Sequence, residues 1–432
     1  MNGIAPAGSP EYVPRVLDSE LDALAAALPA IAIEGAKAVG KTETASRRAN
    51  TIHRLDDIAE LTIAEADLDR VLAAPPPVLI DEWQYLPAVW DKVRRAVDGG
   101  AQPGRFLLTG SATPRGTGTH SGAGRIVSLR MRPLSLAERR PGAATVSLAD
   151  LLSGTRPAVE GSSTLTLEDY ADEIVRSGFP GIRALPERPL RAQLDGYLDR
   201  IVDRDFDELG HALRNPFALR RWMAAYAAAT ATTASYERIR DAASAGSGRP
   251  PAKTTVMPYR DVLERLFVLD AIPGWQPARN QIRRLALPPK HHLADPALAA
   301  RLLGTSAADL LDGSGSGPAM VRGGTLLGAL FESLVTLSIR VYAQAAEASV
   351  GHLRTFSGEH EVDLIVGRHD GCVVAIEVKL GAFARDAGVG HLRWLQTQLG
   401  RDLLDAVIIT TGRDAYRRAD GIAVVPAALL GP

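Results

Sequence analysis

A run near the start of the chain, from Gly35 to Thr42, places two glycines, a lysine and a threonine in the spacing G-x-x-x-x-G-K-T. The apolar Ile31-Ala32-Ile33 precedes it and a helical pattern follows, so a buried strand should turn into a helix here. Backbone N–H groups of such a turn surround a phosphate, and the helix N-terminus adds positive charge. The lysine would reach the β and γ oxygens, and the threonine hydroxyl would ligate Mg²⁺. The spacing therefore predicts a P-loop for ATP and Mg²⁺, formed by Gly35, Ala36, Lys37, Ala38, Val39, Gly40, Lys41, Thr42 and Glu43.

A second apolar strand carries the acids that nucleotide hydrolysis needs. Val78-Leu79-Ile80 runs directly into Asp81 and Glu82. We expect Asp81 to hold the Mg²⁺ shell and Glu82 to polarise the attacking water. Two solvated acids at a strand end are common on their own, but their distance along the chain from the P-loop favours the hydrolytic interpretation.

Hydroxyls and an arginine are the next candidates for contact with the γ-phosphate. The predicted strand Arg105–Thr109 runs into Gly110-Ser111, so Ser111 or Thr109 is expected to sense that phosphate, with a simple turn as the alternative. A Gly/Ser/Thr-rich stretch at 115–124 predicts a mobile loop that leads to Arg125. Arg125 is expected to act as a finger or sensor, in its own chain or toward a neighbouring subunit, unless it is a plain surface arginine.

Acids and a lysine gather again near the end of the chain. Asp363 lies on the predicted strand Glu361–Val366, while Glu377 and Lys379 lie two residues apart on the following strand and point to one face. If these strands fold about Asp370, Asp363 lies opposite Glu377, and the two carboxylates repel each other unless a cation joins them.

Magnesium is the cation that such oxygen ligands favour. Lys379 would then orient or activate the water that attacks phosphorus, and the metal would stabilise the developing charge. Glu332, on the predicted helix Leu326–Ala345, would complete the metal shell. Glu361, two residues from Asp363, competes with it for the ligand role.

The element order of this region, α-β-β-β-α-β, resembles the core of the PD-(D/E)xK nucleases, with Asp363 and Glu377-Val378-Lys379 in the motif positions. It departs from the family name at Val362, where a proline is expected. The resemblance implies a restriction-endonuclease-like α/β fold that handles nucleic acid. The alternative is a fold that has stopped cutting and only holds nucleic acid or a partner.

The chain as a whole is similar to one group of prokaryotic AAA-type ATPases, whose members carry a C-terminal domain of unknown function. The motifs behind this similarity are Gly35 to Thr42, Leu79 to Glu82, Leu108-Thr109-Gly110-Ser111, Gly124-Arg125, Arg132-Pro133-Leu134-Ser135, Ser177-Gly178-Phe179-Pro180 and Asp295-Pro296-Ala297-Leu298. The group also implies a winged helix-turn-helix in the middle of the chain.

The expected fold class is α/β, in four segments. Residues 1–140 form the P-loop AAA-type core, and 141–163, rich in Pro, Gly, Ser and Ala, form a linker. Residues 164–320 form a helical domain with the winged helix, whose third helix would enter the major groove of DNA or serve only in packing. Residues 321–432 form the nuclease-like domain.

Composition excludes several classes of protein. The 432 residues carry a formal net charge of −1, which gives no global attraction to nucleic acid or anionic membrane. One cysteine, Cys372, excludes an internal disulfide framework. Met1–Pro10 lacks a signal-peptide pattern, and we expect no apolar run long enough to span a bilayer. A cytoplasmic protein without a membrane partner is therefore predicted.

The predicted function is ATP binding and hydrolysis coupled to nucleic-acid binding or metal-dependent cleavage, with DNA favoured over RNA. The rival is an ATP-dependent regulatory switch whose C-terminal domain is a non-cleaving docking module. A homo-oligomer is compatible with both, and Arg200 or Arg204 would then be alternatives for contacting a neighbour's nucleotide. No residue in the sequence supports a toxin-like or defence role.

Overall fold

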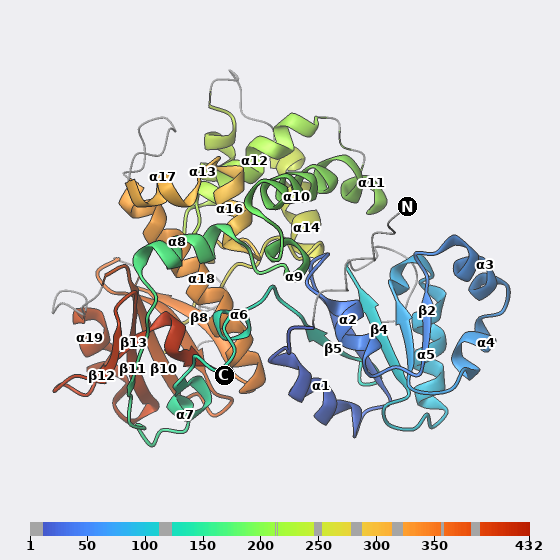
Figure 1. Ribbon diagram of the computed structural model, residues 1–432, viewed down its shortest axis with the longest axis horizontal. Coiled ribbons are helices and arrows are strands. Elements are labelled where there is room, and N and C mark those ends of the chain that lie inside the picture. The colour runs from blue at the N-terminus through green and yellow to red at the C-terminus, as the bar shows by residue number, and fades with distance from the viewer. Residues whose placement is uncertain are drawn as a thin grey trace, which may run out of the picture.

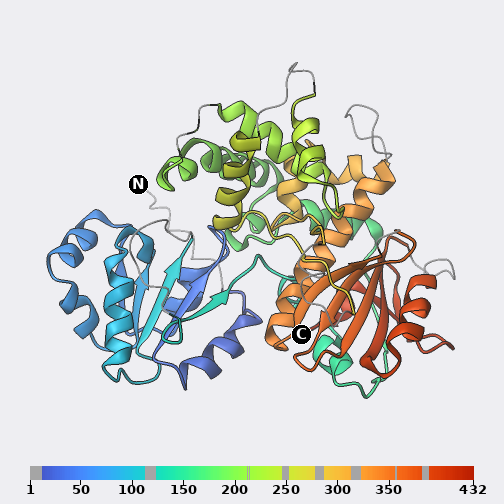
Figure 2. The same ribbon diagram turned by 180° about the vertical axis from the view of Figure 1, so that it is seen from behind.

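The computed structural model describes residues 12–432, except 112–122, 212, 214, 246–252, 278–286, 313–322, 356–357 and 382–388. Figure 1 shows an N-terminal α/β lobe, a C-terminal α/β lobe and a helical region that lies across both. The same arrangement is seen from behind in Figure 2. Most of the loop predicted at 115–124, and all of Met1–Pro10, lie outside the described residues.

The N-terminal lobe is built on a parallel sheet with strand order β2-β3-β4-β1-β5. Its strands β1, β3 and β4 are buried along almost their whole length, as parallel strands covered on both faces should be. Because the strands are parallel, their carboxyl ends meet at one edge, where such sheets bind ligands. The elements are α1 (Leu17–Ala25), β1 (Ala30–Glu34), α2 (Lys41–Ser46), β2 (Thr51–Arg54), α3 (Ile58–Ala66), α4 (Leu68–Ala73), β3 (Val78–Asp81), α5 (Ala88–Asp98), β4 (Phe106–Gly110) and β5 (Val127–Arg130). The next helix, α6 (Leu136–Arg139), packs against the C-terminal lobe.

The helical region has hydrogen-bonding side chains at several helix starts, which explains where its helices begin. Thr166, Asn215, Ser235 and Asp295 each accept a bond from a backbone N–H in the first turn. The helices are α8 (Leu167–Val175), α9 (Pro180–Arg183), α10 (Glu187–Arg200), a π-helical turn η2 (Ile201–Asp205), α11 (Phe206–Glu208), α12 (Pro216–Ala228), α13 (Tyr236–Ala243), α14 (Lys253–Arg265), α16 (Pro296–Leu302) and α17 (Ala307–Asp312).

Two short extended segments follow α14 and pair antiparallel with each other. Leu269 is bridged to Leu293, and Ile272 to Lys290. Three helices followed by such a pair have the order that a winged helix requires. The winged-helix assignment and its DNA contact nevertheless stay predictions, because the order by itself does not distinguish a DNA reader from a packing module.

The C-terminal lobe contains a sheet with strand order β7-β12-β13-β11-β10-β9-β8, in which β7 is Gly161–Ser162. Alternate residues of the central strands enter two different cores: one includes Ile376 and residues of α18, the other Ala375 and residues of α19. The two helices therefore cover opposite faces of the sheet. The elements are α18 (Gly323–Ala345), β8 (Ser349–Arg354), β9 (Glu361–Gly367), β10 (Val373–Lys379), α19 (Gly390–Leu399), β11 (Leu403–Thr410), β12 (Asp414–Arg417), β13 (Ala423–Pro426) and β14 (Leu430–Gly431).

The segment 141–163 is not the linker that its composition predicts. It contains β6 (Val146–Ser147), α7 (Leu148–Leu152) and β7 (Gly161–Ser162). β6 pairs with β14, and β7 pairs with β12 at the edge of the C-terminal sheet. Leu148 and Leu151 are fully buried. The prediction was wrong because Leu148, Leu151 and Leu152, which are buried and at helical spacing, dock a segment whose remaining residues have the composition of a linker.

Three of the short motifs quoted above meet in one place, where the N-terminal lobe joins the helices. Leu134 donates its backbone N–H to the Gly178 carbonyl at 2.7 Å, and Gly178 donates to Asp295 at 2.6 Å. A Cβ on Gly178 would lie 2.6 Å from the Arg139 guanidinium and 2.8 Å from the Leu134 carbonyl oxygen, so only glycine fits. The motifs therefore mark a packing junction between distant segments.

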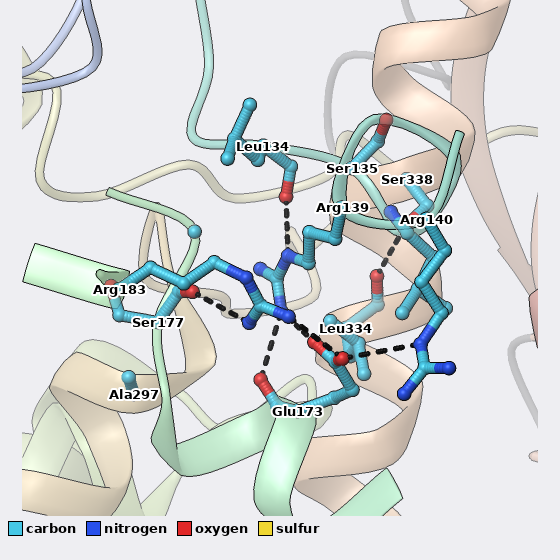
Figure 3. Close-up of polar contacts among 12 residues, drawn as sticks. Leu134, Ser135, Arg139, Arg140, Glu173, Ser177, Arg183, Ala297, Leu334 and Ser338 are labelled. Atoms are coloured by element: carbon cyan, nitrogen blue, oxygen red, sulfur yellow. Dashed lines mark hydrogen bonds and ion pairs between the residues drawn. The ribbon is translucent and has the colours of Figure 1, made fainter. Parts of the chain in front are cut away.

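Ion pairs strengthen the same junction, as Figure 3 shows. Glu173 of α8 lies 2.8 Å from Arg183 and 3.4 Å from both Arg139 and Arg140. Burial alone would raise the pKa of Glu173, but these guanidinium groups hold it below its ordinary value. The junction thus fixes α6, which follows the N-terminal sheet, against α8 and α9.

One helix corrects the expectation about membrane-spanning segments. Leu326–Ala345 of α18 is long and apolar enough to cross a bilayer, with a mean hydropathy of 1.5, and 67% of it is buried inside the protein. A core helix of a folded domain meets the same criteria, so this is weak evidence for a membrane span.

Candidate functional site

The P-loop follows β1 at the carboxyl edge of the N-terminal sheet. Gly40 precedes α2 with φ 100°, a left-handed conformation that favours glycine. The Lys41 ammonium turns inward and donates to the carbonyl oxygens of Gly35 and Ala36 at 2.9 Å and to Ser111 Oγ at 3.0 Å. Burial lowers the pKa of Lys41 to about 8, against the charges of Glu82 and Asp81. The phosphate oxygens of a bound nucleotide would replace these uncharged acceptors of the Lys41 ammonium with charged ones.

The predicted hydrolytic residues converge beside this lysine. Thr42 Oγ1 donates to Asp81 Oδ1 at 2.8 Å, and the Thr109 hydroxyl bonds to the same carboxylate. Ser111 Oγ donates to Glu82 Oε1 at 2.9 Å. Glu82 itself has φ 54°, in the left-handed region that few residues other than glycine adopt. The structure therefore brings together the side chains predicted for phosphate, metal and water, while their roles stay predictions.

The oxygens of Thr42 and Asp81 fit a magnesium ion. A hydroxyl and a carboxylate are hard oxygen donors, which Mg²⁺ prefers, and it usually takes only one or two carboxylates from protein. Ser111 lies between Lys41 and Glu82, whereas Thr109 bonds Asp81. Ser111 is thus the better placed of the two sensor candidates.

Two predicted nucleotide residues lie away from this cluster. The Glu43 side chain is mostly exposed and pairs with Arg47 at 3.2 Å. Arg125 precedes β5, which runs parallel to β1, so it lies at the opposite edge of the sheet from the P-loop. Its Nε donates to Asp98 at 2.8 Å. The prediction that Arg125 reaches the γ-phosphate of its own chain is therefore wrong, and only the role toward a neighbouring subunit stays a prediction.

Lys37 of the P-loop reaches the helical region. Its Nζ donates to Asp205 Oδ1 at 2.7 Å and lies 3.5 Å from Glu208 Oε2. Asp205 ends the π-helical turn η2, and its side chain is only 4% exposed. π-helical turns are rare and are frequently found at functional sites. Arg200 lies 3.9 Å from the same Asp205 carboxylate, so its contact is within its own chain and not with a neighbour. Arg204 is exposed.

A buried arginine that the sequence analysis missed supports the P-loop from behind. Arg15 donates to the Val39 carbonyl at 2.7 Å and to the Arg132 carbonyl at 2.6 Å, and its Nε bonds Glu138 at 2.9 Å. No motif contains Arg15, so the sequence offers no signal for it.

Asp270 forms a second missed contact between lobes. It lies 3.7 Å from Arg130, the last residue of β5, 2.7 Å from Arg132, which follows that strand, and 3.2 Å from Arg340 of α18. Burial would raise the pKa of Asp270, but the three guanidinium charges hold it well below its ordinary value. One carboxylate therefore joins all three parts of the chain.

Comparisons with known proteins agree with the P-loop geometry. Residues 28–139 match the family model described as an AAA domain. The N-terminal lobe is a P-loop ATPase domain of the AAA type. Residues 167–309 and 327–430 of the same chain match two models described as domains of unknown function, DUF8612 and DUF4143. The resemblance to AAA-type ATPases with a C-terminal domain of unknown function is confirmed to that extent.

Whole proteins similar to the chain add little about activity. An uncharacterized protein of Mycobacterium bovis and one of Mycobacterium tuberculosis are each 26% identical over 290 residues, which cover 64% of this chain. The chain spans 56% of the length of these curated relatives. Among solved structures, the Walker-type ATPase PABY2304 of Pyrococcus abyssi aligns at 14% identity with a TM-score of 0.37, over 66% of this chain and 94% of its own.

The carboxylates predicted near the C-terminus also meet. The antiparallel pairing of β9 and β10 runs from Val373↔Gly367 to Ile376↔Leu364, so Glu377 comes next to Asp363 as predicted. Beyond the last paired residues, side-chain oxygens replace backbone carbonyls as hydrogen-bond acceptors. Glu377 Oε2 accepts from the Asp363 N–H at 3.2 Å, and Asp363 Oδ2 accepts from the Val378 N–H at 2.9 Å. Lys379 Nζ lies 3.5 Å from Glu377.

A further lysine, absent from the sequence-based prediction, lies among these acids. Lys290 Nζ is 2.6 Å from Glu332 Oε1, 2.9 Å from Asp363 Oδ1 and 3.6 Å from Glu361 Oε1. Its side chain is 1% exposed. The structure thus brings the four predicted acids together, but it places an ammonium group between Glu332 and Asp363.

Burial dominates the electrostatics of this acidic site. It raises the pKa of Glu377 to about 9, with the Asp363 charge as the second cause. It also raises the pKa of Glu332 to about 8. Burial would likewise raise the pKa of Asp363 and lower that of Lys290, but their mutual attraction reverses both shifts. The Lys290 ammonium therefore offsets part of the negative charge of these acids.

Proposed function

We propose that this protein is an ATP-dependent switch, in which the nucleotide bound by the ATPase domain controls the contact between that domain and the helical region. Lys41 binds the β and γ oxygens, Glu82 orients and deprotonates the attacking water, and Ser111 senses the γ-phosphate. Thr42 and Asp81 would hold Mg²⁺, which would neutralise part of the phosphate charge. Arg125 contacts the nucleotide of a neighbouring subunit if the protein forms a homo-oligomer.

The ion pair between Lys37 and Asp205 is the observation that carries this proposal. Lys37 belongs to the loop that wraps the phosphates, and Asp205 belongs to the helical region, 168 residues away in sequence. A γ-phosphate attracts the Lys37 ammonium and repels the nearly buried Asp205 carboxylate. ATP therefore weakens the Lys37–Asp205 ion pair, and a differential interaction of this kind is what an allosteric switch requires.

Asp205→Asn tests the proposal directly. The asparagine amide is neutral, so it does not repel the γ-phosphate and it holds Lys37 less strongly than the carboxylate does. We therefore expect Asp205→Asn to bind ATP roughly five- to tenfold more tightly than the wild type does. Equilibrium titration with ATP and Mg²⁺ measures the change. Glu208→Gln is the matched control, because Glu208 is 3.5 Å from Lys37 with a side chain 47% exposed, and its effect should be smaller. Unchanged or weaker ATP binding by Asp205→Asn contradicts the coupling.

A second candidate function is metal-dependent handling of nucleic acid by the C-terminal lobe. The observation that favours it is the placement of Asp363, Glu377 and Lys379 on paired strands, as in the nucleases that this region resembles. In this proposal the lobe and the helices around α14 contact DNA in preference to RNA. Incubating plasmid, single-stranded DNA and RNA with Mg²⁺ or Mn²⁺, for wild type and Asp363→Ala, tests it. Cleavage by the wild type but not by Asp363→Ala, with or without added ATP, supports the candidate, and no cleavage by the wild type in either condition contradicts it.

A further inference from the structure

We propose that Lys290 is a built-in cation that takes the place of a divalent metal in the C-terminal acidic site and keeps metal out of it. The site is then a masked metal site, which opens only when the segment carrying Lys290 moves. This inference stands on the geometry of the acids alone and does not rest on the ATP-dependent switch.

The ammonium group occupies the space that a shared metal ion would need. Glu332 comes from α18 and Asp363 from β9, and each places a carboxylate oxygen within 2.9 Å of Lys290 Nζ. Mg²⁺ binds such oxygens at about 2.0–2.1 Å. An ion bound to both carboxylates would therefore lie too close to the Lys290 ammonium for the two cations to occupy the site together. Metal and lysine therefore compete for the same lone pairs.

The other acids do not form an alternative metal site while Lys290 is present. Glu361 also faces the ammonium, at 3.6 Å, and Glu377 is bonded to the Asp363 backbone. Within the described part of the chain, no group of three or more His, Cys, Asp or Glu side chains is arranged to hold a metal ion. As built, the residues do not fit the metal that the nuclease resemblance implies.

The backbone holds Lys290 in place. Its N–H and C=O both bond to Ile272 at 2.9 Å, and the next residue, His291, donates to the Thr232 carbonyl at 2.9 Å. Pro288, two residues earlier, accepts a bond from the His352 ring of β8 at 3.0 Å. The lysine thus comes from the helical region and is fixed against the C-terminal sheet. Removing its side chain from the acids requires this strand pair to shift, which links the state of the acidic site to the position of the helical region.

Manganese binding to the nucleotide-free full chain tests the proposal. In the wild type we expect no Mn²⁺ binding that depends on Asp363, so wild type and Asp363→Asn should give the same titration by electron paramagnetic resonance. In Lys290→Ala the carboxylates lose their cation, and we expect Mn²⁺ to bind more than about tenfold more tightly than to the wild type. The gain should disappear in the double variant Lys290→Ala/Asp363→Asn.

Lys379→Ala is the matched control, because Lys379 is 42% exposed and lies 3.5 Å from Glu377 without separating the acids. It should not create the Mn²⁺ site. Mn²⁺ should also raise the unfolding midpoint of Lys290→Ala and not that of the wild type. If Lys290→Ala does not fold, Lys290→Met, which keeps the volume of the side chain, takes its place, and the wild-type comparison with Asp363→Asn is decisive by itself. Asp363-dependent Mn²⁺ binding in the wild type, or no gain in either Lys290 variant, overturns the proposal.

Discussion

Replacing Lys41 by alanine is expected to lower ATP turnover by at least about a hundredfold, the usual cost of removing one group that stabilises charge in the transition state. In the structure Lys41 is 4% exposed, and its ammonium group donates to two carbonyl oxygens and a hydroxyl. Phosphate oxygens are much stronger partners for it, so the free energy of this interaction appears only when the nucleotide is bound. A steady-state phosphate-release assay measures the loss.

Lys92→Ala is the control for that experiment. Lys92 also forms an ion pair, at 2.7 Å from Asp69, but it lies on the surface away from the P-loop. Its removal should leave turnover unchanged. Turnover by Lys41→Ala at the wild-type rate would mean that the P-loop is not where hydrolysis occurs.

Asp270→Ala is expected to lower the free energy of unfolding by about 3 kcal/mol or more. The reason is that the carboxylate is the shared partner of Arg130, Arg132 and Arg340, and its removal leaves these buried guanidinium groups to repel one another. Burial already lowers the pKa of Arg130 to about 10, which shows how little solvent compensates its charge. Urea unfolding, with ATPase activity measured in parallel, gives the size of the effect.

Asp98→Ala provides the comparison. Asp98 pairs with Arg125 at 2.8 Å, but both side chains are at least 40% exposed, so the expected loss is much smaller than that of Asp270→Ala. Equal effects of the two substitutions would show that Asp270 is not a junction between the lobes.

The candidate site residues could be predicted from the sequence wherever they are consecutive or lie at a fixed spacing. The P-loop needs only a strand, glycines and a helix in order, and Asp363 falls beside Glu377 because a hairpin turning at Asp370 leaves no other register. These arguments use local geometry, which propensity and alternation describe well.

Contacts between distant segments could not be found in the same way. Lys37 and Asp205 are 168 residues apart, and nothing in either neighbourhood points to the other. Arg125 was assigned to the nucleotide because it follows the predicted loop, but the direction of β5 places it at the far edge of the sheet. Lys290 was overlooked because it precedes the expected domain boundary at 320, while the structure carries it back into the C-terminal acids.

Hydrogen exchange of the backbone amides at 201–208, with and without a non-hydrolysable ATP analogue and Mg²⁺, tests the central claim most directly. We expect the analogue to speed exchange in this segment of the wild type, because the Lys37–Asp205 contact weakens, and to leave it unchanged in Lys41→Ala. Unchanged exchange at 201–208 in a wild-type protein saturated with the analogue would contradict the claim that the nucleotide controls the helical region.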